Sequence, residues 1–449
     1  MALTGIQIFK LLPKTNCGEC GVPTCLAFAM NLAAGKAELT RCPHVTAEAS
    51  AELAEASAPP IRPLTIGTGD RAVKVGGETV LFRHEKRFEN PTALAMLISD
   101  TIADSELAAK LERAKNLIYE RVGLTLRPEL LALKCQSGDA AKFAALVDKV
   151  ARGSDFSLIL MSDNPDVLAA GLKACADRRP LLYAATPENA DKVAALAKEA
   201  GCPVAAKAPG IEELGNLTEK LTQAGIKDIV IDSSSRKVKD VFADQVHIRM
   251  SALVKKFRPL GFPTIVFACE MADNPMKEAL VAALAVAKYG AIVVLSDFQG
   301  ESLFPLLVAR MNLFTDPQRP LATTEGIYEI GNPNENSPVL LTSNFSLTYF
   351  LVSGEIENSK VPSYLLVKDT EGLSVMTAWA AGKFVADAIA PFVKKSGIAD
   401  KVKHRKLIIP GYIASESGGL EEELADWQVQ VGPREGAHIP AYLKAWKDA

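Results

Sequence analysis

The sequence has no apolar run long enough to span a membrane and no excess of charge of either sign. Its most apolar stretch, residues 279–295, is interrupted by Lys288, whereas a membrane-spanning helix needs about 20 mostly apolar residues. The 50 lysines and arginines nearly balance the 53 aspartates and glutamates. Balanced charge without basic blocks argues against a nucleic-acid partner. We therefore expect neither a membrane nor a nucleic acid among the partners of this chain.

The N-terminus also lacks the pattern of a secretory signal peptide. Lys10 and Lys14 break the short apolar stretch at residues 6–12. We expect a cytoplasmic protein, in which thiols stay reduced. Of the eight cysteines, four lie in the first 42 residues and four are scattered. Scattered cysteines are usually small buried hydrophobic residues, and here they are Cys135, Cys175, Cys202 and Cys269.

The clustered cysteines follow the pattern C-x2-C-x4-C-x16-C, and a proline follows the last one. They are Cys17, Cys20, Cys25 and Cys42. Thiolates favour an iron–sulfur cluster or zinc. Structural zinc sites usually pair two short Cys-Cys units, whereas close cysteines with a Cys-Pro are typical of ferredoxin-like clusters. The spacing therefore predicts a [4Fe–4S] cluster, with zinc as the alternative.

The residues around this motif predict a small separate domain. A helix over residues 26–34, ended by Gly35, separates the third and fourth cysteines. His44 is expected near the cluster or at the surface rather than as a ligand. Residues 45–60, which are rich in Ala, Ser and Glu and end in two prolines, predict a short helix and then a linker. The cluster domain is thus expected to span residues 1–58.

Residues 59–325 alternate between apolar runs and amphipathic stretches, which predicts βαβ units and a parallel sheet. About eight such units fit a (β/α)8 TIM-type barrel, and an open doubly wound sheet is the alternative. The expected strands are residues 80–82, 130–133, 157–161, 181–183, 204–206, 228–231, 264–268 and 291–295. Asp232 and Asp297 each follow a strand. They could form an acid/base or ligand-binding pair, but we favour capping of the next helices.

Residues 326–449 are expected to form a C-terminal α/β domain, after a proline-rich boundary or crossing segment at 314–338. The expected strands are residues 339–342, 364–367, 406–409 and 427–431. The expected helices are residues 347–355, 374–395, 420–426 and 441–448. Open α/β sheets bind ligands at the carboxyl ends of their strands. Neither a dinucleotide-binding G-x-G-x-x-G nor a phosphate-binding loop occurs here.

The cysteine motif and this order of domains resemble one family. This family consists of the large (gamma) subunits of the corrinoid iron–sulfur protein, which belongs to the acetyl-CoA (Wood–Ljungdahl) pathway of carbon fixation. The most specific element is residues 16–25 with Cys42 and Pro43. The resemblance implies a Rossmann-like C-terminal domain that binds a base-off, cobalamin-type corrinoid.

Members of this family are methyl carriers of anaerobic metabolism. The resemblance implies that Co(I) accepts the methyl group of methyltetrahydrofolate, through a partner methyltransferase. The methyl group then passes to the nickel centre of acetyl-CoA synthase/CO dehydrogenase, and the [4Fe–4S] cluster reduces any Co(II) that forms. The further implied partner is a small barrel subunit, which makes a heterodimer. The chain would then be a carrier subunit of a methyltransferase system, with no catalytic side chain of its own.

The expected corrinoid contacts are the residues that follow the strands of the C-terminal domain. They are Leu340, Thr342, Ser343, Asn344, Ser346, Thr370, Glu371, Gly372, Leu373, Ser374, Gly411, Pro433, Arg434 and Glu435. Ser374 either caps a helix or faces the lower side of the corrin ring, and one serine could do both. None of the five histidines lies in an Asp-x-His-x-x-Gly motif. Cobalt is therefore not expected to be ligated by histidine.

Two other functions remain open. The chain could be an electron-transfer protein whose C-terminal domain binds a flavin, because residues 342–346 faintly resemble a flavodoxin phosphate loop. It could also be an assembly subunit with an empty C-terminal domain. We interpret the barrel as structural and partner-binding, although a pterin in the barrel is a third option.

Overall fold

The computed structural model describes residues 5–33, 36–37, 39–46, 49–50, 53 and 58–446. The chain divides into two compact units. The first consists of residues 1–81, 89–114 and 129–303, and the second of residues 82–88, 115–128 and 304–449. No helix in the described parts of the chain is long and apolar enough to cross a membrane.

The N-terminal segment of the first unit is a small helical module. Its elements are α1 (Gly5–Leu11), α2 (Cys25–Ala33) and the 3-10 helix η1 (Leu39–Arg41). Ile8, Leu12 and Phe28 are buried together in its core. The predicted helix at residues 26–34 is confirmed as α2, but its expected end at Gly35 lies outside the described residues. Most of the helix expected at residues 45–60 also lies outside them.

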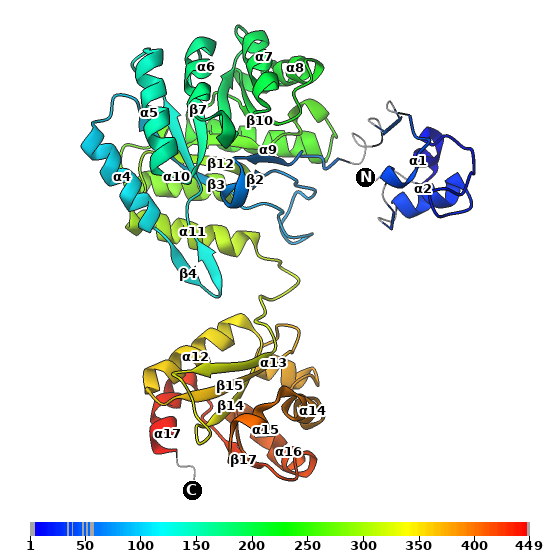
Figure 1. Cartoon of the computed structure of the whole chain (residues 1–449), viewed down its shortest axis with the longest axis vertical. Helices are drawn as coiled ribbons and strands as arrows, with labels where there is room; N and C mark the ends of the chain where they lie inside the picture. Colours follow the sequence, from blue (N-terminus) through cyan, green and yellow to red (C-terminus); the bar gives the residue numbers. More distant parts are fainter. Residues whose placement is uncertain are drawn as a thin grey trace. The chain divides into compact units, whose positions relative to one another are not determined.

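The rest of the first unit is a closed barrel of eight parallel strands, surrounded by helices (Figure 1). Its strands, in barrel order, are β3 (Ala93–Ser99), β6 (Leu130–Lys134), β7 (Ser157–Met161), β8 (Leu181–Ala185), β9 (Val204–Lys207), β10 (Ile229–Asp232), β11 (Thr264–Phe267) and β12 (Gly290–Leu295). The predicted barrel is confirmed, and the open doubly wound alternative is wrong. The barrel forms because these strands are apolar along both faces, as a parallel sheet covered by helices requires.

The expected first strand, at residues 80–82, is wrong. These residues are not in a strand, and the chain enters the barrel at β3 instead. The charged residues 83–87 follow directly, so the short apolar run cannot continue into a buried strand. An antiparallel pair, β1 (Leu64–Ile66) with β2 (Val73–Val75), precedes the barrel, and its side chains pack on the barrel core.

In the described part of the chain, eight helices surround the barrel, and three of them begin with a side-chain cap. The eight helices are α4 (Asp104–Asn116), α5 (Ala140–Gly153), α6 (Pro165–Lys173), α7 (Ala190–Ala200), α8 (Gly210–Gln223), α9 (Val238–Leu253), α10 (Pro275–Ala287) and α11 (Gly300–Phe314). Asp139 caps α5 by accepting from the backbone N–H of Ala141 at 2.8 Å. Asn164 and Asn274 cap α6 and α10, each followed by a proline in the first turn.

The second unit contains a five-stranded sheet in the order β13-β15-β14-β16-β17. Its strands are β13 (Gly326–Ile330), β14 (Val339–Ser343), β15 (Ser363–Lys368), β16 (Lys406–Ile409) and β17 (Gln428–Val431). The four predicted strands correspond to β14–β17, which are parallel. Strand β13 was missed: it is an antiparallel edge strand between prolines, in the segment expected to be a boundary.

Helices cover both faces of this sheet. Leu341 packs with Ile389 on one face, and Leu340 packs with Ile356 on the other. The helices are α12 (Ser346–Ser359), α13 (Val375–Ala380), α14 (Ala386–Ser396), α15 (Ile398–Lys401), α16 (Ser417–Glu423) and α17 (Ile439–Ala445). The single helix expected at residues 374–395 is wrong, because the chain breaks near Gly382, whose φ is 71°. A hairpin of β4 (Tyr119–Arg121) and β5 (Leu124–Leu126) also belongs to this unit.

Candidate functional site

The loop that carries the first cysteines is folded by backbone conformations that glycine allows. Gly18 and Gly21 have φ of 77° and 86°, and the N–H of Gly21 donates to the carbonyl of Gly18 at 2.9 Å. A residue with a Cβ is strained in this left-handed region. The two glycines therefore let the chain turn tightly between Cys17 and Cys25.

Asn16 and Cys25 hold the two ends of this loop together. The backbone N–H of Cys25 donates to Asn16 Oδ1 at 2.8 Å, and the backbone N–H of Asn16 points at Cys25 Sγ at 3.4 Å. Cys25 is buried at the start of α2, whereas Cys20 and Cys42 are half-buried against the same core and Cys17 is exposed. An N–H directed at a sulfur is a common feature of iron–sulfur sites, where it tunes the cluster potential. The donor set therefore fits a thiolate-bound cluster.

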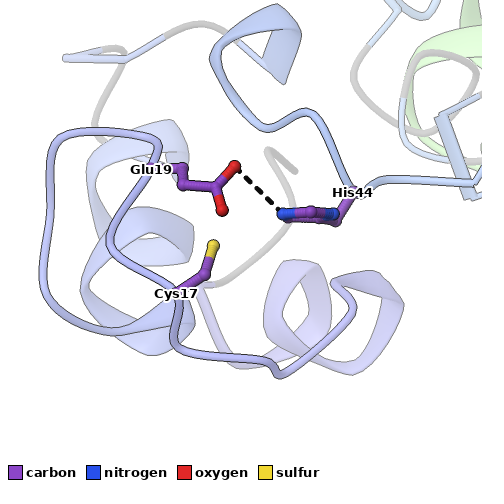
Figure 2. A group of neighbouring side chains, drawn as sticks. All are labelled: Cys17, Glu19 and His44. Atoms are coloured by element: carbon purple, nitrogen blue, oxygen red, sulfur yellow. Dashed lines mark hydrogen bonds and ion pairs between the residues drawn. The ribbon is translucent and has the colours of Figure 1, made fainter.

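Cys17 faces Glu19 and His44, as Figure 2 shows. The ligand atoms of these three exposed side chains lie within 4.8 Å of one another, and His44 Nε2 is 3.1 Å from Glu19 Oε2. In the described part of the chain, this is the only group of three or more potential metal ligands so close together. His44 was expected near the cluster or at the surface, and it lies both beside Cys17 and at the surface. Glu19 was not anticipated, because a glutamate between two cysteines carries no metal signal of its own.

The second unit has an apolar cavity of about 250 Å³ at the carboxyl ends of β14, β16 and β17. The chain passes from β14 to β15 on one side and returns to β16 on the other. Such a reversal opens a crevice between the loops, which is where open α/β sheets bind ligands. The cavity is lined by Leu340, Leu341, Thr342, Thr348, Leu351, Val352, Ser374, Val375, Met376, Ile408, Ile409, Pro410, Tyr412, Gly432, Pro433, Arg434, Gly436 and Ile439.

Of the expected corrinoid contacts, five line this cavity: Leu340, Thr342, Ser374, Pro433 and Arg434. The hydroxyl of Thr342 is buried and has no hydrogen-bond partner among the described residues. Ser374 occupies the N-cap position of α13 without a side-chain capping bond. A buried polar group normally finds a partner, so the Thr342 hydroxyl is a candidate contact for a ligand in this cavity.

The other expected contacts are not in the cavity wall. Asn344 organises the loop after β15: its Oδ1 accepts from the N–H groups of Thr370 and Gly372, both at 3.0 Å, and from the Thr370 hydroxyl at 2.9 Å. Gly411 lies beneath the cavity, against the backbone of residues 432–434. The remaining ones are Ser343, Ser346, Glu371, Leu373 and Glu435.

Sequence reasoning missed the part of the wall that α12 provides, and in the loop after β16 it named Gly411 but not Tyr412. Leu351 and Tyr412 are exposed at 51% and 43% although both are large. Large exposed apolar side chains beside a cavity mark a binding surface. In the sequence, Leu347 and Leu351 are four residues apart and so lie on one face of the expected helix. That spacing could have pointed to a binding surface, but it fits equally well a helix face that packs on the core of the domain.

The two aspartates that follow barrel strands do not cap the next helices, so the favoured interpretation is wrong. Asp232 is buried and pairs with Arg236, whereas α9 begins later, with Lys237 at its N-cap position. Asp297 pairs with Arg113 at 2.6 Å. Helix α9 begins at Val238 and α11 at Gly300, so each helix starts too far along the chain for the aspartate to occupy its N-cap position.

Comparison with known proteins decides the family. Residues 63–443 match the family described as CO dehydrogenase/acetyl-CoA synthase delta subunit, and residues 12–44 match a putative Fe-S cluster family. The chain is 49% identical over 445 residues to the corrinoid/iron-sulfur protein large subunit of Moorella thermoacetica, with 99% of each chain covered. This chain belongs to the family of corrinoid/iron–sulfur protein large subunits. The resemblance predicted from the cysteine motif and domain order is confirmed.

More distant relatives agree with this assignment. The chain is 37% identical over 453 residues to the acetyl-CoA decarbonylase/synthase complex subunit gamma of Methanopyrus kandleri, covering 98% of this chain and 97% of that one. A dihydropteroate synthase structure from Coxiella burnetii covers 57% of this chain with a TM-score of 0.40 and 13% identity. The N-terminal match makes residues 12–44 an iron–sulfur domain, so zinc is not supported.

Proposed function

We propose that this chain carries methyl groups between two partner enzymes. It accepts the methyl group of methyltetrahydrofolate from a methyltransferase and delivers it to the nickel centre of acetyl-CoA synthase. The identity of 49% over the full length of a corrinoid/iron-sulfur protein large subunit carries this proposal. When bound, the corrinoid supplies the cobalt that holds the methyl group, and the [4Fe–4S] cluster supplies the electron that restores its reactive state.

The cavity of the second unit is the proposed corrinoid site, in a domain that we propose is Rossmann-like. Its apolar wall and the unpartnered hydroxyl of Thr342 suit a large, mostly apolar ligand with a few polar atoms. Ser374 and Arg434 supply further polar contacts from two other loops. No histidine is among the lining residues, which supports a cobalt without a histidine ligand. The volume of about 250 Å³ suits one part of the corrinoid, and exposed Leu351, Met376 and Tyr412 extend the apolar surface for the rest.

The proposed ligands of the cluster are Cys17, Cys20, Cys25 and Cys42. All four are free thiols on one small module, and Cys25 already receives an N–H from Asn16. We further propose that the chain works in the cytoplasm as a heterodimer with a small barrel subunit. The motif of four clustered cysteines suits a reducing location, where thiols are available to bind metal.

Metal analysis tests both cofactor sites together. The protein is produced anaerobically with its small subunit in a host supplied with corrinoid. We expect about four iron and one cobalt per chain, with the absorption spectrum of a base-off corrinoid. Iron without cobalt but with flavin absorption would instead identify an electron-transfer protein, and zinc in place of iron would refute the cluster.

Cysteine variants assign the cluster ligands. Cys42→Ser should lose iron and keep cobalt, because it removes one thiolate from the cluster and lies outside the second unit. Cys135→Ser is the matched control, since Cys135 lies in the barrel, and it should keep both metals. Iron content that is unchanged in Cys42→Ser would remove Cys42 from the ligand set.

A further inference from the structure

A second cavity, of about 330 Å³, opens at the carboxyl ends of barrel strands β6 to β10. In TIM-type barrels this end of the strands carries the ligand sites. The methyl-carrier function proposed above does not use it, because its lining comes entirely from the first unit. The charged residues of the wall are Lys134, Asp163, Lys207, Arg236 and Glu270.

The floor of this cavity is a buried ion pair. Asp232, only 3% exposed, accepts from Arg236 through both oxygens, at 2.8 and 3.1 Å. It also accepts from the Tyr183 hydroxyl at 2.6 Å and from the backbone N–H of Ser234 at 2.8 Å. Burial raises the pKa of Tyr183 well above its usual value, so the hydroxyl remains a donor. A buried ion pair commonly stabilises a fold less than apolar side chains of the same volume, so stability alone does not explain this floor.

Two lysines of the wall are not committed to the floor. Lys207 Nζ bonds to Asp163 at 3.1 Å, and the Asp163 side chain is 64% exposed, against 28% for Lys207. Lys134 Nζ is 3.9 Å from Glu270, which is beyond hydrogen-bonding distance. Ion pairs this exposed contribute about 0–1 kcal/mol. Glu270 also accepts from Arg236 Nε at 2.5 Å, so it belongs to the floor network. A ligand carboxylate or phosphate can therefore replace Asp163 on Lys207 at little cost.

We propose that the mouth of the barrel binds a small oxyanion, a carboxylate or a phosphate ester, between Lys134 and Lys207 above the Asp232–Arg236 floor. The lysine of the better-defined pair, Lys207, lies deeper than the carboxylate that faces it, so the ammonium group of Lys207 is the more enclosed charge of that pair. The cavity volume is at the lower end for small-molecule sites, so the ligand is small.

Calorimetric titration of the full-length protein tests the proposal. Inorganic phosphate and malonate are the probes, at constant ionic strength set with chloride. At least one of them should bind saturably, and Lys134→Met/Lys207→Met should weaken it at least about tenfold. Lys220→Met is the matched control, because Lys220 pairs with Asp191 on the outer helices of the same barrel. Its affinity should be unchanged.

A variant that binds the anion more tightly than the wild type distinguishes a change in the binding site from a loss of folding. Asp163→Asn removes the carboxylate that competes for Lys207, so the bound anion should bind at least about threefold more tightly. A misfolded variant cannot produce this result. If the wild-type protein binds phosphate more tightly than malonate, the natural ligand is a phosphate ester. If it binds malonate more tightly than phosphate, the natural ligand is a carboxylate. The proposal is overturned if neither probe binds saturably, or if wild type, the double variant and Asp163→Asn have equal affinities.

Discussion

At the scale of single residues, Thr342 and Ser343 are neighbours in the second unit whose buried hydroxyls both lack a hydrogen-bond partner among the described residues. They differ in their position relative to the cavity. Thr342 lines the cavity at the end of β14, whereas Ser343 does not. Leaving a buried polar group unpaired costs about 1–3 kcal/mol. A ligand in the cavity can repay that cost only at Thr342.

This difference predicts the same change in stability but different corrinoid affinities for two conservative variants. Thr342→Val should raise the stability of the cofactor-free protein by about 1 kcal/mol and lower its affinity for corrinoid about tenfold. Ser343→Ala should raise stability similarly and leave affinity unchanged. All three tryptophans lie in the second unit, so urea unfolding followed by tryptophan fluorescence reports on this unit alone. Equal corrinoid affinity in the two variants would contradict the proposed site.

The environment of Asp100, which follows barrel strand β3, allows a prediction of how the stability of the first unit depends on pH. Burial alone would raise the pKa of its carboxyl, but the Ser137 hydroxyl at 2.5 Å and the N–H groups of Gln136 and Ser137 lower it overall. A lowered pKa in the folded state means that the carboxylate stabilises the fold above its unfolded pKa, near 3.8. That contribution is lost as the pH falls through the folded value.

Asp100→Asn should therefore lower the free energy of unfolding by about 1.5–3 kcal/mol at pH 7 and by less near pH 3. Thermal unfolding at the two pH values measures this. Asp148→Asn is the control, because Asp148 forms only an exposed pair with Arg152. A loss for Asp100→Asn of the same size at both pH values would refute the assignment.

At the scale of elements, the loops after β16 and β17 touch closely enough to form the base of the cavity. A Cβ on Gly411 would lie 2.6 Å from the carbonyl oxygen of Gly432 and 2.8 Å from the backbone nitrogen of Arg434. Both atoms belong to the backbone, so neither can rotate away. Glycine at this position therefore sets the spacing of the two loops.

Gly411→Ala should push these loops apart, lowering stability by about 1–3 kcal/mol and reducing the cobalt content. Gly418→Ala is the control, because a Cβ at Gly418 in α16 meets nothing within 4 Å. It should leave cobalt unchanged and stability equal or slightly higher. Full cobalt content in Gly411→Ala would show that the loop spacing does not matter for the cofactor.

Three elements were misassigned from the sequence, each for a different physical reason. Strand β13 was missed because it is a short edge strand between prolines, which local patterns describe as a loop. The break between α13 and α14 depends on Gly382, and a single glycine within a helical pattern does not require a break. Apolar periodicity identified the buried barrel strands reliably, except for the first, where an isolated apolar run before charged residues was taken for β3.

At the scale of the whole molecule, the cysteine spacing and domain order were enough to predict the family, and the alternation of about eight strand and helix units predicted the closed barrel. They could not predict the cavity wall, because Leu351, Met376 and Tyr412 join Thr342 only when separate loops and helices meet. The network around Asp232 was also out of reach, since Tyr183 and Arg236 come from different parts of the barrel. The domain boundaries at residues 58 and 325 stay a prediction.

The most direct test of the methyl-carrier proposal is the transfer of an isotopically labelled methyl group. The reduced holoprotein, with its small subunit, is incubated with labelled methyltetrahydrofolate and the methyltransferase, and then re-isolated. We predict about one labelled methyl group per cobalt, all of it passing into acetyl-CoA when acetyl-CoA synthase, CO and coenzyme A are added. A fully loaded protein that takes up no label, or holds label that acetyl-CoA synthase cannot remove, would contradict the proposal.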